Sequence, residues 1–156
     1  AEVFPKECMG CVCYGSKNAI VAAFPYQVAS RKDMEVCSDS SVYFDKMFKT
    51  GLFKKLGDFH SHTFQSFEKL QPLTPSPTDL NQLPIGGIEV IVQIRRTRKK
   101  SNSWRTTKGG SVSIAWDRYR FLIAAFMRID GHDKDKVPLY KKVGLLLDGT
   151  KNERKL

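Results

Sequence analysis

A run of seven residues, Ile88 to Ile94, constrains the fold of this chain more than any other segment. Five of the seven are β-branched and apolar, which favours a strand over a helix. Because apolar residues fall on both faces of such a strand, both faces must be covered. We therefore expect Ile88 to Ile94 to lie in the interior of a sheet.

Two pairs of segments are typical of antiparallel hairpins. Cys8 to Tyr14 and Ala19 to Phe24 flank a turn of glycine, serine, lysine and asparagine, and Pro25 is expected to end the second strand. Ser111 to Trp116 and Tyr119 to Arg128 are β-rich runs that only two residues separate. These segments predict further strands of the sheet.

Helical patterning is strongest between Ser38 and Gly57. The stretch Ser38 to Ser41 offers N-cap residues, and Gly57 is expected to stop the helix. The apolar residues spaced to line one helix face are Val42, Met47, Phe48, Leu52, Phe53 and Leu56. Beyond the helix, Asp58 to His62 is a candidate strand, and the polar stretch Thr63 to Pro75 is expected to be a loop.

A second, shorter helix is expected after this loop. Ser76 is placed to be its N-cap, Pro77 its first residue and Asp79 the third, and the helix should end near Pro84. Nearer the C-terminus, Val137 to Leu147 is compatible with either a strand or a helix.

Two histidines in the candidate strand have the spacing of metal ligands. Residues two apart on a strand project from one face, so His60 and His62 can direct imidazole nitrogens to one point. Asp79 is the best-placed carboxylate for a third ligand, which leaves a fourth position for water, as in catalytic zinc sites. Zinc lowers the pKa of such a water to about 7. Glu7 is a candidate general base, and Ser76 a candidate hydrogen-bond donor to an oxyanion.

These residues together resemble the JAMM/MPN+ (Mov34/JAB1-type) zinc metalloprotease motif, an upstream glutamate followed by HxH and SxxD. The matching segments are Pro5 to Glu7, Gly10, Gly15, Gly57 to His62, Pro75 to Leu80, Gly87 to Ile94 and Tyr119 to Arg128. The resemblance implies an α+β fold of the MPN/JAB1-like, cytidine-deaminase-like class. In such a fold a curved mixed β-sheet is flanked by helices, and the zinc site lies at one end of the sheet.

The resemblance also implies a role for each site residue. One zinc ion per chain would be bound by His60, His62 and Asp79, with Glu7 as general acid/base and Ser76 steadying the tetrahedral intermediate. Family members hydrolyse isopeptide or peptide bonds after the C-terminal tail of ubiquitin or a ubiquitin-like protein, and some prokaryotic relatives act on sulfur-carrier proteins. We therefore expect a zinc-dependent isopeptidase or peptidase. The alternative is a non-catalytic MPN-like module that engages nucleic acid or a protein assembly.

Two features depart from the family pattern. Thirteen residues, Thr63 to Pro75, separate His62 from Ser76 where the family usually has seven, and Thr63 stands where a proline is usual. The longer loop is expected to reshape the substrate groove without moving the ligands, which leaves the choice of substrate open.

The four cysteines permit two interpretations. With no secretory signal they are expected to be reduced, and Cys11 and Cys13 fit small core positions on one face of a strand. A second, structural zinc site on Cys8, Cys11, Cys13 and Cys37 is the alternative. Against it, Cys8 should point away from Cys11.

The segment Arg95 to Lys108 holds seven basic residues without an apolar period, which predicts an exposed loop. Its candidate partner-binding residues are Arg95, Arg96, Arg98, Lys99, Lys100 and Trp104. The loop is either a solvated element, a clamp for single-stranded nucleic acid, or a means of attracting an acidic ubiquitin-like partner. The formal net charge of +10 favours an acidic partner, and nucleic acid is the less favoured one.

Composition and length suit one globular domain. The 156 residues are 41% hydrophobic and 27% charged, with the domain expected over 1–148 and a flexible tail over 149–156. The longest apolar runs fall well short of the ~20 residues that cross a bilayer, and no signal-peptide pattern opens the chain. We therefore expect no membrane association and a cytoplasmic location.

Overall fold

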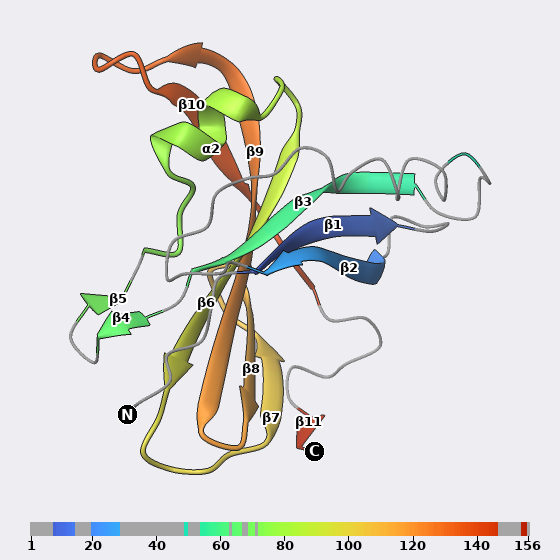
Figure 1. Cartoon of the computed structure of the whole chain (residues 1–156), viewed down its shortest axis with the longest axis vertical. Coiled ribbons are helices and arrows are strands. Elements are labelled where there is room, and N and C mark those ends of the chain that lie inside the picture. Colours follow the sequence, from blue (N-terminus) through green and yellow to red (C-terminus); the bar gives the residue numbers. More distant parts are fainter. Residues whose placement is uncertain are drawn as a thin grey trace.

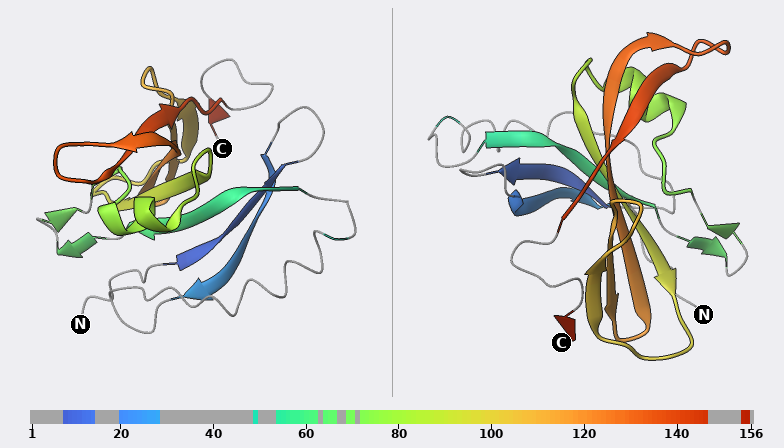
Figure 2. Two further views of the ribbon diagram at one scale, coloured as in Figure 1. Left: turned by 90° about the horizontal axis from the view of Figure 1, so that it is seen from above. Right: turned by 180° about the vertical axis from the view of Figure 1, so that it is seen from behind.

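The computed structural model describes residues 8–14, 20–28, 49, 54–62, 64–66, 69–70, 72–146 and 154–155 (Figures 1 and 2). Within these residues the chain forms a nine-stranded mixed sheet, a separate two-stranded hairpin and one short helix. The order of the sheet is β11-β7-β8-β9-β6-β3-β1-β2, and β10 pairs with β9 beside this path. The expected mixed sheet is thus confirmed, and with few helices among the described residues the structure is roughly consistent with the expected α+β class.

The described elements have the following bounds. The large sheet contains β1 Cys8–Tyr14, β2 Ile20–Val28, β3 Lys54–His62, β6 Ile88–Arg96, β7 Ser103–Thr106, β8 Val112–Trp116, β9 Tyr119–His132, β10 Pro138–Val143 and β11 Arg154–Lys155. The hairpin consists of β4 Phe64–Ser66 and β5 Lys69–Leu70, and helix α2 spans Pro77–Gln82. In Figure 1, β1 to β3 run across the view while β6, β8 and β9 run along its long axis, so the sheet is strongly twisted. No helix in these ranges has both the length and the apolar character to cross a membrane.

Strand β6 is the interior strand that its composition predicts. It pairs with β3 on one side and with β9 on the other, without a break in either register. Its apolar residues alternate between two buried clusters, one on each face of the sheet. These clusters are Val12, Val90 and Ala125 on one face and Ile91, Ala124 and Phe126 on the other. Both faces of β6 are therefore covered, as expected.

The pairing of β3 with β6 is parallel, unlike every other ladder in the described part of the sheet. Parallel neighbours cannot be joined by a tight turn, so residues 63–87 form a crossover connection. The register runs from Gly57 beside Ile88 to His62 beside Gln93. Helix α2 belongs to this crossover, which carries it back to the sheet, where it lies beside β10.

Gly57 lies inside β3, which corrects the predicted helix end. A Cβ atom at this position would overlap the carbonyl oxygen of Ile88, so the close approach of the two strands requires glycine. Lys54 to Leu56 are the first residues of β3 rather than the last turn of a helix. The rest of the predicted helix, apart from Lys49, lies outside the described residues.

Strand β2 also differs from the prediction, because it runs through Pro25 to Val28. The register with β1 shifts between Met9 and Gly10, where Gly10 stands opposite Pro25. β2 is an edge strand of the described sheet, and an edge with an irregular register tolerates a residue that has no N–H group.

The segment Arg95 to Lys108 is not one exposed loop. Arg95 and Arg96 extend β6, and Ser103–Thr106 forms β7, which pairs with β8. Trp104 stands opposite Ile114, so an apolar cross-strand pair orders a segment that looks uniformly polar.

The remaining expectations can be placed in the same way. The β1–β2 and β8–β9 hairpins and the N-terminus of α2 are confirmed. The stretch 63–75 contains β4 and β5, and the undecided segment 137–147 contains strand β10. Within the stretch 149–156, Arg154–Lys155 forms β11 on the edge of β7.

Substituting Gly57 by alanine should destabilise the chain by about 1–3 kcal/mol, because the methyl group meets backbone rather than a movable side chain. Urea unfolding followed by circular dichroism measures the effect. Gly144→Ala is the matched control, since nothing lies within 4 Å of its Cβ position. Equal midpoints for the two variants would contradict the close approach of β3 and β6.

Candidate metal centre

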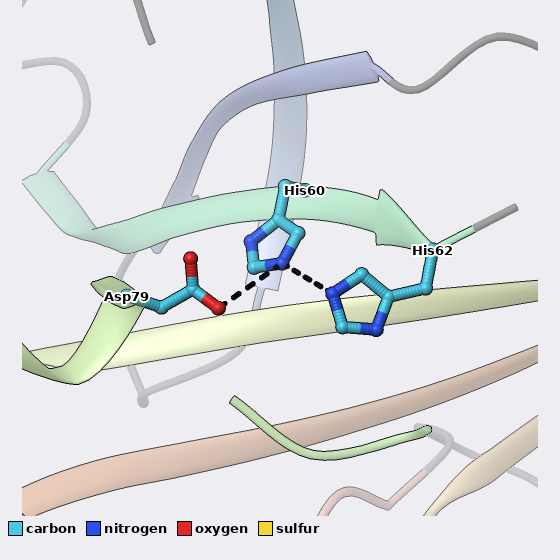
Figure 3. A group of neighbouring side chains, drawn as sticks. All are labelled: His60, His62 and Asp79. Atoms are coloured by element: carbon cyan, nitrogen blue, oxygen red, sulfur yellow. Dashed lines mark hydrogen bonds and ion pairs between the residues drawn. The ribbon is translucent and has the colours of Figure 1, made fainter. Parts of the chain in front are cut away.

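Strand β3 brings the two histidines together. His60 and His62 project from one face, and their ring centroids lie 4.7 Å apart (Figure 3). Their Nε2 atoms face each other at 2.8 Å. Both residues are largely withdrawn from solvent, with His62 only 8% exposed. The two-residue spacing therefore places both imidazole rings on one face of the strand, as predicted.

Helix α2 supplies the third group through its first turn. The Ser76 amide donates to Asp79 Oδ2 at 2.7 Å, and the Asp79 amide donates to Ser76 Oγ at 3.2 Å, which is a capping box. The same Asp79 Oδ2 lies 3.7 Å from His60 Nε2. One ligand atom from each of His60, His62 and Asp79 falls within 4.8 Å of the others, so this group could hold a metal ion.

Hydrogen bonds at the far side of each ring fix which nitrogen faces the centre. His62 Nδ1 lies 2.6 Å from the Pro72 carbonyl oxygen, which can only accept, so Nδ1 carries the proton. His60 Nδ1 lies 2.7 Å from Glu89 Oε1, and an ionised carboxylate requires the same protonation. In neutral rings both Nε2 atoms then present lone pairs to each other.

Two lone pairs at 2.8 Å repel unless a cation lies between them. A proton on one Nε2 or a metal ion bound by both removes the repulsion. The carboxylate of Asp79 beside the pair adds a negative, oxygen-donating group, which can serve as a third ligand to a divalent metal ion. The donor set of two imidazoles and one carboxylate therefore fits zinc.

Glu89 is the site residue that the sequence pattern did not reveal. It lies on β6, is 8% exposed, and its Oε2 atom has no hydrogen-bond partner within the described part of the chain. A carboxylate that holds the remote nitrogen of a metal-binding histidine orients the ring and raises its basicity. The signal was an acidic residue inside the apolar run Ile88 to Ile94, since a buried carboxylate needs a specific partner.

Glu7, the predicted general base, lies outside the described residues. The next residue along the chain begins β1, and this start of the strand is placed beside the histidines. The Cys8 amide donates to Ser61 Oγ at 2.8 Å, and Met9 pairs with His60 across the ladder. The position of Glu7 relative to the histidines stays a prediction.

The cysteines contribute no ligand to the group formed by the described residues. Burial raises the pKa of the Cys8 thiol, which favours the protonated form over the thiolate that binds zinc. Cys11 is buried in the core, as the strand pattern predicts. The Cys13 side chain and Cys37 lie outside the described set, so the second zinc site stays untested.

The basic candidates lie toward the end of β6 at which Gln93 pairs with His62. Arg95, Arg96, Arg98, Lys99 and Lys100 are exposed, at and beyond the carboxyl end of β6. Two of these side chains contact polar residues of the same sheet region. Arg95 Nε donates to Gln93 Oε1 at 2.9 Å, and Lys100 Nζ lies 3.3 Å from Asp117 Oδ1. Trp104 is half-buried on β7.

The purified chain should take up one zinc ion per molecule, and His60→Ala should lose it. Elemental analysis after dialysis against trace zinc measures the stoichiometry. His132→Ala is the control, because His132 is exposed at the end of β9 and should not affect uptake. Full zinc content in a folded His60→Ala variant would exclude this centre.

Replacing Glu89 by glutamine should weaken zinc binding about tenfold, and by leucine up to about a hundredfold, because the His60 ring loses its charged acceptor. Competition with a chromogenic chelator gives the affinities. Asp130→Asn, an exposed carboxylate on β9, is the matched control. Unchanged affinity in folded Glu89 variants would show that the contact with His60 has no role in metal binding.

Comparison of the chain with protein-family models, with curated proteins and with solved structures finds no match. The family resemblance therefore depends on the motif residues themselves. What supports a function is the convergence of His60, His62 and Asp79.

Proposed function

We propose that this chain is a zinc-dependent peptidase or isopeptidase of the JAMM/MPN+ type. The observation that carries the proposal is the meeting of two imidazole Nε2 atoms and one carboxylate oxygen, delivered by a strand and by the first turn of a helix. The glutamate, HxH and SxxD elements of the motif supply the family assignment. A mixed sheet that carries this group beside its parallel strand pair supports an MPN-like fold.

The composition of the group favours a catalytic rather than a structural metal site. Structural zinc sites are closed by four protein ligands, usually with cysteines among them, whereas catalytic sites use three ligands and keep one position open. Among the described residues the group contains three candidate ligands and no cysteine. The Asp79 side chain is 24% exposed, which leaves the group open to solvent on the α2 side.

Each residue of the site has a task in amide hydrolysis. When bound, zinc acts as a Lewis acid and lowers the pKa of a coordinated water to about 7. We assign to Glu7 the transfer of a proton from the attacking water to the leaving amine. The Ser76 hydroxyl accepts a hydrogen bond from the Asp79 amide and keeps its own proton to donate to a developing oxyanion.

The proposed substrate is the C-terminal tail of a ubiquitin-like or sulfur-carrier protein. Such a tail is extended and can bind through main-chain hydrogen bonds to a strand. The net charge of +10 raises the rate of encounter with an acidic protein. A non-catalytic module is the rival function, and retention of all five motif residues favours the enzyme.

Glu7→Gln should keep its zinc and lose at least about a hundredfold in cleavage rate, because glutamine cannot take up the proton. The substrates are two linear fusion proteins. In one the bond to be cleaved follows a ubiquitin-like tail, and in the other it follows a sulfur-carrier tail. Mass spectrometry measures the cleavage. Glu2→Gln is the matched control, with the same change five residues earlier in the chain. Undiminished turnover by zinc-loaded Glu7→Gln would show that another group is the base.

A further inference from the structure

One end of the sheet carries most of the net positive charge of the molecule. Residues 95–120 contain nine basic side chains and one acidic one, out of a net charge of +10 for the whole chain. They belong to the outer part of β6, to β7 and β8, and to the start of β9, which form the lower end of the sheet in Figure 1. We call residues 94–121 the basic blade.

Aromatic side chains gather on a single face of this blade. The unbroken registers place Trp116 opposite Tyr119, and Tyr119 opposite Arg96, in one row across three strands. Partners directly across a ladder point to the same face, so these three side chains share it. The next row across the strands consists of Trp104, Ile114, Phe121 and Ile94.

These rows lie on the face opposite to the metal group. His60 pairs with Ile91 and shares its face. Ile94 is three residues further along β6, so it points the other way. A ligand on the aromatic face would therefore not occupy the space in front of the histidines.

The aromatic face is open to solvent. Trp116 is 59% exposed, and Trp104, Tyr119 and Phe121 are each partly exposed. Large aromatic rings that are exposed or partly exposed on one sheet face and bordered by arginine are typical of a recognition surface. Its charge specifies an anionic partner.

We propose that the basic blade binds single-stranded nucleic acid, with bases stacked on the aromatic face and phosphates held by the surrounding arginine and lysine side chains. Sequence-tolerant binding of single strands combines these two features, a positive track for the backbone and flat rings for unstacked bases. Acidic side chains would satisfy the charges, but a carboxylate offers no ring that could stack on the aromatic rows. Duplex nucleic acid would not present its base faces to them.

The test is fluorescence anisotropy of the full chain with labelled twenty-nucleotide oligo-dT and oligo-rU over a range of salt concentrations. Binding should weaken with salt, with a slope of about −0.7 per phosphate contacted in a plot of log affinity against log salt. Trp116→Ala should lower affinity about 5- to 100-fold, because a stacked base is lost, with the slope unchanged. The double variant Arg98→Ala, Lys99→Ala should reduce the slope by about 1.4, equivalent to two phosphates.

Matched controls separate the blade from general surface effects. Leu146→Ala removes an apolar side chain that is 85% exposed, and Lys134→Ala with Lys141→Ala removes two exposed charges outside the blade. Both controls should bind as the unmodified chain does, and circular dichroism should show every variant folded.

Three results would overturn the proposal: no binding at 100 mM salt, affinity unaffected by Trp116→Ala, or displacement of the oligonucleotide by polyglutamate at equal charge concentration. The last would assign the surface to acidic proteins. Oligonucleotide binding should persist after a chelator has removed zinc. The cleavage assay contains no nucleic acid, so its outcome does not depend on the basic blade. The peptidase and the nucleic-acid surface can therefore fail separately.

Discussion

The parallel pairing of β3 with β6 is the constraint on which the rest of the site depends. It places Glu89 behind His60, and it obliges residues 63–87 to cross over and carry α2 back to the sheet. Gly57 permits the pairing, because no side chain fits between its Cα atom and the Ile88 carbonyl group. The site beside the β3–β6 pair thus depends on three features, which are the glycine in β3, the buried acid in β6 and the capped helix α2.

Contacts from outside the group orient all three candidate ligands. Glu89 and the Pro72 carbonyl group hold the two rings by their Nδ1 atoms, and the Ser76 amide holds the Asp79 carboxylate. These contacts direct three electron-rich atoms to one point, an arrangement that is unfavourable without a cation and favourable with one. Preorganisation of this kind reduces the cost of ordering ligands upon binding.

Local signals predicted the parts of the fold that depend on neighbours in sequence. Ser76, Pro77 and Asp79 take the N-cap, N1 and N3 positions because capping uses atoms within one helical turn. The strand run at Ile88 and the turn between β8 and β9 were identified for similar reasons. The position of the two histidines on one face followed from the two-residue period of a strand.

Errors arose where distant pairing decided the outcome. By sequence alone Gly57 is typical of a helix end, but its role in the structure is to allow the close approach of Ile88. Ser103–Thr106 is typical of a loop by sequence, but pairing with β8 makes it a strand. Glu89 contacts His60 only because of the register of β3 with β6. That register cannot be read from the sequences of the two segments taken separately. The faces of the basic blade likewise depend on three registers at once.

The proposed function requires that His60, His62 and Asp79 hold one metal ion. Anomalous diffraction at the zinc edge from crystals of the zinc-loaded chain tests it most directly. One peak is expected about 2.0–2.2 Å from both Nε2 atoms and from a carboxylate oxygen of Asp79. An absent peak, with the two Nε2 atoms still in contact through a proton, would contradict it.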